Sequence, residues 1–323
     1  MMRTWSVYGY QTLRVIEPLQ LIAGLSYDNT AFPENTLNAP VSSASERLDL
    51  LAPKAGVVWT PAARTTLRGA YTRSLAGADL DASLALEPSQ VAGFTQAYRS
   101  LAPESVVGAQ PGMSFETFGI SLEQSLAFGT YLGLGGELLF SDGDRSLGGF
   151  DAIPPAPALW AVPMQFREHI EYRERALTAS VSQLIGDRLT IGARYRLAES
   201  GLESSIEDVP PDMAADGFAP RQSLESVLHQ IGLDAVFNHP SGLFARLEAL
   251  WNLQTNHDDL APLGRDDFWH FNVLAGYRFA HRRAEIAVGV LNLFDQDYRL
   301  SPLTPHRDLA HERTAVVRLR LDF

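Results

Sequence analysis

Hydrophobic and polar residues alternate with a period of two along most of the chain. In LTIGARYRLA (residues 189–198) apolar residues occupy the odd positions, and mostly polar or small residues occupy the even ones. The same alternation runs through LFARLEALWNLQ (243–254) and through the final stretch RTAVVRLRLDF (313–323). Successive side chains of a β-strand point to opposite faces, so each stretch predicts a strand with one apolar face. A helix would instead repeat its apolar positions every three or four residues.

Read in this way, the pattern predicts about thirteen strands, and it is least regular in the third, fifth and seventh of them. The expected strands are residues 3–13, 19–28, 48–60, 65–74, 113–123, 129–141, 166–184, 189–199, 224–238, 243–254, 268–279, 284–294 and 312–323. No repeat of fixed period stands out beyond this hairpin unit, which argues against a propeller or a solenoid.

The connections between these strands alternate between short and long. Short links carry turn residues or charge, namely VIEP (15–18), PAAR (61–64), GDR (186–188), HPSG (239–242) and HRR (281–283). Long links occupy residues 29–47, 75–112, 142–165, 200–223, 255–267 and 295–311. Long structureless loops are uncommon in compact soluble domains, whereas outer-membrane barrels have short periplasmic turns and long extracellular loops. We therefore predict an all-β, antiparallel, up-and-down transmembrane β-barrel, and an odd number of strands makes it a partial one.

Aromatic residues mostly fall near the ends of the expected strands. They are Trp5, Tyr27, Trp59, Tyr71, Tyr131, Tyr195, Trp251, Trp269, Tyr277 and Phe323. Amphipathic rings favour the membrane–water interface, and membrane barrels carry aromatic girdles at both rims. The alternative is that these rings form the core of a soluble β-sandwich binding module such as a lectin.

Composition narrows the function classes. The chain of 323 residues has a formal net charge of -12 and no dense basic cluster, which argues against nucleic acid as a partner. It has no cysteine, so disulfides and thiolate metal sites are excluded. The sequence shows neither an apolar run of the roughly 18–20 residues that a membrane helix needs nor a secretory hydrophobic region at its start.

Candidate chemistry is sparse. SDGDRS (141–146) has two aspartates around a glycine like the start of a calcium loop, but it lacks the later ligands, so a plain turn is expected. NHDD (256–259) is interpreted in the same way, as a solvated loop. The eight histidines form no metal-ligand pair at helical spacing, and no Gly-x-Ser-x-Gly elbow is present. We expect no catalytic residues, no metal and no cofactor; a barrel hydrolase built from loop residues is the distant alternative.

The polar faces of the strands form a more coherent set. A charge on the lipid face of a barrel costs roughly 2–4 kcal/mol at the bilayer midplane, so charged strand residues are expected to face the lumen. The residues concerned are Arg68, Arg194, Arg196, Arg246, Glu248, Arg278, Arg318 and Arg320. They either hydrate and pair inside the barrel or line a polar path for a solute, and one sequence does not separate these roles.

Several stretches resemble TonB-dependent outer-membrane receptors. VGVLNLFDQDYRL (288–300) is similar to the penultimate strand of that family, with Asn292, Leu293, Phe294, Asp295 and Tyr298 matching its motif. The closing strand, with Val317, Leu319, Leu321 and terminal Phe323, resembles the family's C-terminal assembly signal. LAPKAGVVWTPAARTTLRGAYTRSL (51–75) is similar to the family's Pro-Lys-x-Gly strand and the strand after it, and LQLIAGLSYD (19–28) to a third, although Ser26 stands where arginine is usual.

The resemblance implies a receptor and transporter in the outer membrane of a Gram-negative bacterium. It would take up a scarce nutrient of the siderophore, cobalamin or glycan class by energy-coupled transport, without enzymatic chemistry. The implied partners are outer-membrane lipid, the barrel assembly machinery that reads the terminal strand, and an energy-coupling protein acting through a plug domain. The substrate would be a small molecule or a glycan.

Two features depart from the family pattern. The sequence shows neither a plug domain nor the short motif that binds the coupling protein, and the family's barrel has about 22 strands with a plugged lumen. An open sheet edge in lipid leaves backbone groups unsatisfied. We therefore expect residues 1–323 to be the C-terminal part of a longer barrel whose plug and signal peptide are absent from this chain. A passive porin or an export barrel is the alternative function.

Overall fold

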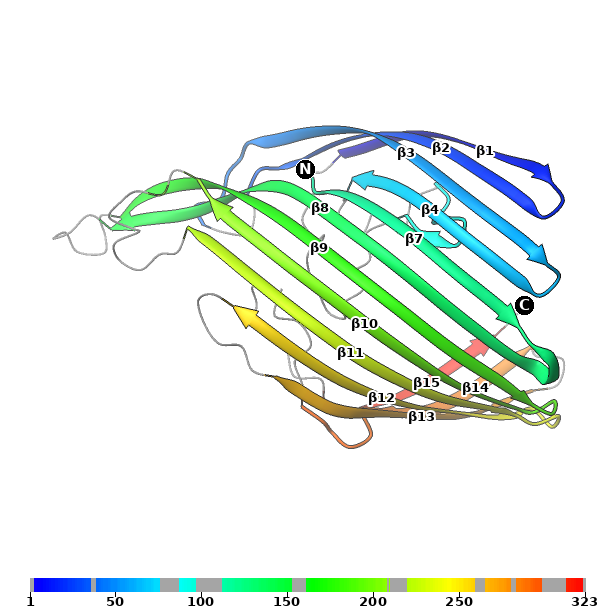
Figure 1. Ribbon diagram of the computed structural model, residues 1–323. Coiled ribbons are helices and arrows are strands. Elements are labelled where there is room, and N and C mark those ends of the chain that lie inside the picture. The colour runs from blue at the N-terminus through cyan, green and yellow to red at the C-terminus, as the bar shows by residue number, and fades with distance from the viewer. Residues whose placement is uncertain are drawn as a thin grey trace.

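Thirteen long strands form one antiparallel sheet in the computed structural model, which describes residues 3–35, 39–75, 87–96, 112–152, 161–207, 209, 220–258, 265–279, 283–297 and 312–321. Each strand pairs with the next long strand along the chain, which is an up-and-down meander (Figure 1). The strands are β1 (Arg3–Ile16), β2 (Leu19–Pro33), β3 (Ser45–Ala62), β4 (Thr65–Leu75), β7 (Ser114–Ser125), β8 (Thr130–Ala152), β9 (Ala161–Ile185), β10 (Leu189–Ile206), β11 (Arg221–Asn238), β12 (Leu243–Asp258), β13 (Asp266–Arg278), β14 (Ala284–Leu291) and β15 (Thr314–Leu321).

The predicted number and order of the long strands are confirmed, and the differences lie at their ends. β8 and β9 have 23 and 25 residues, because both continue far into the link expected at 142–165. The SDGDRS stretch is therefore part of β8, and its interpretation as a turn is wrong. In the opposite direction, β14 ends at Leu291, so the Asn292–Phe294 part of the motif lies in a turn after the strand.

The sheet is curved and open. In the described residues β1 pairs only with β2, and β15 pairs only with β14. The short turns lie together at one end of the sheet, as Figure 1 shows. Because neighbouring strands run in opposite directions and there are thirteen long strands, the two edge strands, β1 and β15, run in the same direction. One continuous sheet accounts for all the long strands, so the alternative of two stacked sheets in a soluble sandwich is wrong.

One face of the sheet, here called the outer face, is apolar across all thirteen strands. Cross-strand neighbours such as Leu132, Val181, Ala193 and Leu233 form continuous rows on it. These side chains are exposed in the protein alone; Leu134, for example, is 50% exposed. On β9 the outer-face positions from Leu177 to Ile185 are apolar except for Gln183, and they cover about 26 Å along the strand at roughly 3.3 Å per residue. At a strand tilt of 35–45° this length corresponds to roughly 19–22 Å of height, which is most of the apolar band of a membrane barrel, about 25 Å tall.

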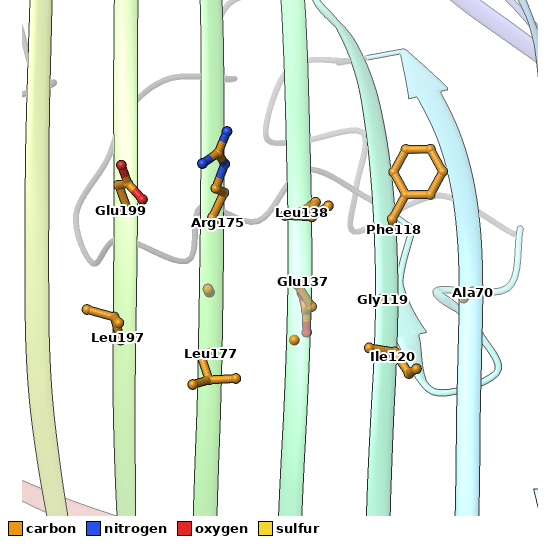
Figure 2. A pocket seen from close by; sticks show the side chains of 12 residues that line it. Ala70, Phe118, Gly119, Ile120, Glu137, Leu138, Arg175, Leu177, Leu197 and Glu199 are labelled. Carbon is orange, nitrogen blue, oxygen red and sulfur yellow. The ribbon is translucent and has the colours of Figure 1, made fainter.

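The outer face contains a shallow hollow of about 440 Å³. Gly136 has no side chain to fill the space between Ile120, Leu138 and Leu177, and Figure 2 shows these side chains around it. Arg175, which precedes the apolar stretch of β9, marks the polar boundary of the band. No helix within the described residues is both long and apolar enough to cross a membrane.

The opposite face, here called the inner face, carries the buried residues. One apolar cluster packs on the strand halves remote from the short turns and comprises Met113, Phe115, Leu139, Ile170, Tyr172 and Leu224. A second unites Ala198, Leu228 and Phe268. A two-stranded hairpin, β5 (Gln90–Val91) and β6 (Phe94–Thr95), also lies on this face between β4 and β7 in sequence. Residues 87–96, called the inner hairpin below, were not expected from the sequence.

Candidate functional site

The charged strand residues that were expected to face the lumen lie on the inner face. Strand register puts all of the following opposite the apolar outer face: Arg68, Arg194, Arg196, Arg246, Glu248, Arg278, Arg318 and Arg320. They do not form one site. Part of the set gathers on β12–β15 near the short turns, whereas Arg194 and Arg196 stand apart on β10.

Glu285 joins two arginines across three strands. Its carboxylate accepts hydrogen bonds from Arg278 Nε at 2.9 Å and from Arg318 Nη2 at 2.6 Å. The Arg278 guanidinium also donates to Asn238 Oδ1 at 2.6 Å and lies 4.1 Å from the centre of the Phe244 ring. Charge-assisted hydrogen bonds and a cation–π contact thus fix Arg278 against the wall. This group joins β11–β15 at the turn end of the inner face.

A second group of polar residues leads from β12 towards the family motif. Arg246 pairs with Glu248 on the same strand. The other oxygen of Glu248 accepts a hydrogen bond from Asn272 Nδ2 at 3.3 Å. Asn272 Oδ1 in turn accepts the backbone N–H of Asn292 at 3.0 Å. The predicted lumen residues Arg246 and Glu248 are therefore connected, through Asn272, to the motif at the end of β14.

The Asn292–Asp295 motif builds a tight turn. Asn292 and Asp295 both adopt positive φ, 51° and 58°, a region in which asparagine and aspartate are favoured after glycine. The buried Asn292 side chain bonds Gln296 twice, donating to its carbonyl and accepting its N–H, each at 2.9 Å. Asp295 Oδ1 accepts the backbone N–H of Arg313 at 2.7 Å, which holds the chain where it enters β15. Phe294 is exposed and meets Phe271 edge-on at 5.2 Å.

Substitution of Asn292 tests this interpretation of the motif. Asn292→Ala removes two hydrogen bonds and leaves at positive φ an alanine, whose side chain has no polar group to stabilise that conformation. We therefore expect the free energy of unfolding to fall by about 2 kcal/mol. Asn292→Gly keeps the backbone freedom and should lose about half as much. Urea unfolding of the folded protein in detergent measures both, and equal losses for the two variants would contradict a backbone role.

A group of charged residues lies above the apolar band, where β8 and β9 form a protruding ribbon. Arg167 Nη2 lies 2.9 Å from Asp144 Oδ2 and 3.8 Å from Glu46 Oε1, so it links the ribbon to β3. His169 Nδ1 lies 2.7 Å from the other oxygen of Asp144. The hydrogen bond to Asp144 raises the pKa of His169, against the opposing effect of burial. Burial acts to raise the pKa of Asp144, but hydrogen bonds from His169 and Arg167 outweigh it and lower that pKa.

These shifts predict pH dependence of the link. The raised pKa of His169 gives stabilisation that is complete below its ordinary 6.5 and is lost as pH rises through the folded value. The lowered pKa of Asp144 gives stabilisation that is present above its ordinary 3.8 and is lost as pH falls through the folded value. Hydrogen exchange of residues 144–146 and 167–171 should therefore be slowest, relative to the intrinsic rate, between these values. In His169→Gln the loss of protection above neutral pH should disappear, and its persistence would contradict the assignment.

Lys54 forms the polar site that the sequence did not predict. It is 4% exposed on the inner face, pairs with Glu87 of the inner hairpin, and donates to Ser26 Oγ at 3.0 Å. The Tyr10 hydroxyl lies within hydrogen-bonding reach of two acceptors, the Glu87 carboxylate and Gln96 Oε1, the latter at 2.9 Å, and shares its one proton between them. The Pro-Lys-x-Gly match contained the signal, since Lys54 holds the hairpin and Gly56 leaves room for it. Ser26, which departs from the family pattern, occupies the place beside the lysine.

The remaining motif positions lie partly outside the described residues. Val317, Leu319 and Leu321 lie on the outer face of β15, where they are 76%, 65% and 51% exposed. Tyr298 and Phe323 belong to the stretches that the structure does not describe. Among the described residues no three His, Asp or Glu side chains are placed to hold a metal ion.

The geometry and the comparisons with known proteins agree on the class. A single curved antiparallel sheet with an exposed apolar outer face and a polar inner face is the architecture of the wall of an outer-membrane β-barrel. Residues 2–123 match the family described as TonB dependent receptor-like, beta-barrel. No curated protein matches the sequence.

Solved structures extend the likeness to the rest of the chain. The ferripyoverdine receptor of the outer membrane of Pseudomonas aeruginosa superposes with a TM-score of 0.55 and 14% identity, over 89% of this chain and 40% of that one. The ferric yersiniabactin uptake receptor FyuA from Yersinia pestis gives 0.51 and 10% identity, over 99% of this chain and 50% of that one. The chain thus spans half or less of the length of these structures.

The family match and the fold together support a barrel portion of a TonB-dependent receptor. They indicate the outer membrane of a Gram-negative bacterium as its location. The matched family consists of transporters, in agreement with the expectation that the protein is not an enzyme.

Proposed function

We propose that the protein is the barrel of an outer-membrane receptor that takes up a scarce nutrient by energy-coupled transport. The observation that carries the proposal is the exposed apolar outer face of the long antiparallel sheet, in combination with the receptor-family match over residues 2–123. The ionic groups on the inner face supply a hydrated wall for a polar solute. Siderophores, cobalamin and glycans are the nutrient classes considered. The structures of similar fold include a ferripyoverdine receptor and a ferric yersiniabactin uptake receptor, which favours the siderophore class.

The open sheet is proposed to be one part of a larger barrel. Because β1 and β15 run in the same direction, closure with antiparallel pairing requires an odd number of further strands. Joining two copies of this sheet would leave β1 of one copy beside β15 of the other in parallel, so a dimer does not solve the problem. A barrel of about 22 strands would need about nine more, which is odd and therefore compatible. A plug attached to the same polypeptide would connect the barrel to its energy-coupling protein.

Uptake measurements test the receptor proposal. Cells expressing the full reading frame and cells deleted for it would be supplied with labelled ferric siderophores, cobalamin or oligosaccharides, with and without a protonophore. The receptor proposal expects one class to be taken up only with the gene and only without the protonophore. Gene-dependent uptake that survives the protonophore would favour the passive porin, and identical uptake in both strains would refute both.

A further inference from the structure

The inner hairpin is built into the barrel wall. Although it belongs to the long connection between β4 and β7, its apolar residues are buried against the inner face: Val91 is 1% exposed and Phe94 is 7% exposed. An extracellular loop would be expected to leave such residues in contact with solvent or other loops. Here they pack on β3 and β7, at the depth of the membrane-spanning wall.

Two glycines of the wall form seats for these side chains. A Cβ on Gly56 would lie 2.8 Å from Val91 Cγ1 and 3.0 Å from Ala92 Cβ. A Cβ on Gly119 would lie only 2.2 Å from the Phe94 ring. The hairpin therefore occupies space that any larger residue at these positions would need. Gly136 lies on the neighbouring strand, and a Cβ added to it would point to the outer face. That Cβ would meet no atom closer than 3.8 Å.

Ionic and polar contacts tie down both ends of the hairpin. Glu87, at its start, pairs with the buried ammonium group of Lys54. Gln96, at its end, accepts a hydrogen bond from Tyr10 and donates to the carbonyl of Pro88 at 2.6 Å. Unseating the hairpin would leave the Lys54 charge without its carboxylate on the wall. In the seated position the ammonium group of Lys54 is buried and compensated by Glu87, and unseating would break this pair together with the apolar contacts of Val91 and Phe94.

We propose that the inner hairpin is a resident seal of the lumen. It closes the space beside β1–β4 and β7 to small hydrophilic solutes, as a fixed part of the wall. The seal works whether or not the barrel imports a nutrient, so this inference goes beyond the proposed receptor function.

Disulfide trapping tests the seated position. Because the sequence of 323 residues contains no cysteine, a disulfide within it can form only between the two introduced residues. Gly56→Cys combined with Ala92→Cys brings two Cβ positions to 3.0 Å, slightly closer than the roughly 3.5–4.5 Å of disulfides, so a small shift permits the bond. Val91→Ala is added to this pair and to its control, because it removes the Cγ1 atom that would lie 2.8 Å from the new Cβ of residue 56. Val57→Cys with Ala92→Cys is the matched control, because Val57 points to the outer face. In the full-length protein in outer membranes, thiol labelling after denaturation should show nearly complete bonding in the first pair and none in the control. Equal yields in both would overturn the proposal.

Permeability tests the sealing. Gly119→Val should unseat the hairpin and Gly136→Val should not, so the two are a matched pair of wall substitutions. Phe94→Ala with Glu87→Gln weakens the hairpin without changing the wall, in case Gly119→Val fails to fold. Unseating should lower the disulfide yield severalfold and raise entry of a chromogenic cephalosporin, hydrolysed by a periplasmic β-lactamase, severalfold. The proposal would be overturned if unseating the hairpin did not raise entry of the cephalosporin. It would also be overturned if Gly136→Val raised that entry as well. No nutrient is involved, so failure of the receptor proposal would leave this result intact.

Discussion

Replacing Val181 by arginine is expected to destabilise the barrel by about 2–4 kcal/mol, because it puts a charge into lipid at mid-membrane depth. Val181 is midway between Leu177 and Ile185 in the apolar stretch of β9, and its cross-strand neighbours on the outer face are Leu132 and Ala193. No carboxylate lies beside it in these rows. The free energy of unfolding in lipid vesicles, and the fraction of folded protein recovered from outer membranes, measure the effect.

Ser182→Arg is the matched control. Ser182 follows Val181 at nearly the same depth but points to the inner face. Its cross-strand neighbour there is Gly192, and the Asp234 carboxylate occupies the space beside that glycine. An arginine there has water and an acceptor within reach, so stability close to that of the unmodified protein is expected. Equal damage from both substitutions would mean that the assignment of faces, on which every other conclusion depends, is wrong.

The second large effect is expected at the Lys54–Glu87 pair. Removing the carboxylate alone, as in Glu87→Leu, leaves the almost fully buried ammonium group of Lys54 with only Ser26 as a hydrogen-bond acceptor among its described contacts. An uncompensated buried charge costs about 3–5 kcal/mol, unless the hairpin leaves its seat and admits water. Replacing both partners, Lys54→Met with Glu87→Leu, removes the charge as well and should recover most of the loss.

A double-mutant cycle separates the pair from its surroundings. Urea unfolding and disulfide yield at positions 56 and 92 would be recorded for both single variants and for the double variant. The expected result is strong coupling, with the double variant closer to the unmodified protein than the Glu87→Leu variant is. Additive losses would show that the two side chains act independently and that the ion pair does not hold the hairpin.

The wall of the barrel could be predicted from sequence because one physical rule governs it. Lipid on one side and water on the other impose a period of two, so stretches such as 189–198 revealed both the strand and its lipid-facing side. The period of two is expected only in the membrane-spanning part of each strand. Beyond Leu177, β9 continues with arginines and glutamates on both faces, and the alternation disappears. Residues 142–165 were interpreted as a loop, although the pairing of β8 with β9 persists through 142–152 and 161–165.

The inner hairpin and the motif turn could not be predicted in this way. The hairpin pairs only two residues in each strand, and its place is decided by contacts with Gly56, Gly119 and Lys54, which are distant in sequence. The turn after β14 depends on the positive φ of Asn292 and Asp295, whereas the preceding alternation simply suggested more strand. Side-chain placement on the inner face followed from register, but the arrangement of Glu285 between Arg278 and Arg318 needed the three-dimensional structure.

The unequal strand lengths have a consequence for what the cell surface presents. β9 continues for about 50 Å along its axis beyond Leu177, at roughly 3.3 Å per residue, whereas β14 and β15 have eight residues each. In Figure 1 the β8–β9 ribbon reaches well past the other strands. Because the strands of membrane barrels tilt by about 35–45°, this length corresponds to roughly 35–43 Å of height above the level of Leu177. Phe150 and Val162 are exposed near the end of the ribbon, so in the expected orientation, with the long connections outside the cell, a large molecule approaching from outside would meet the ribbon before the rest of the sheet.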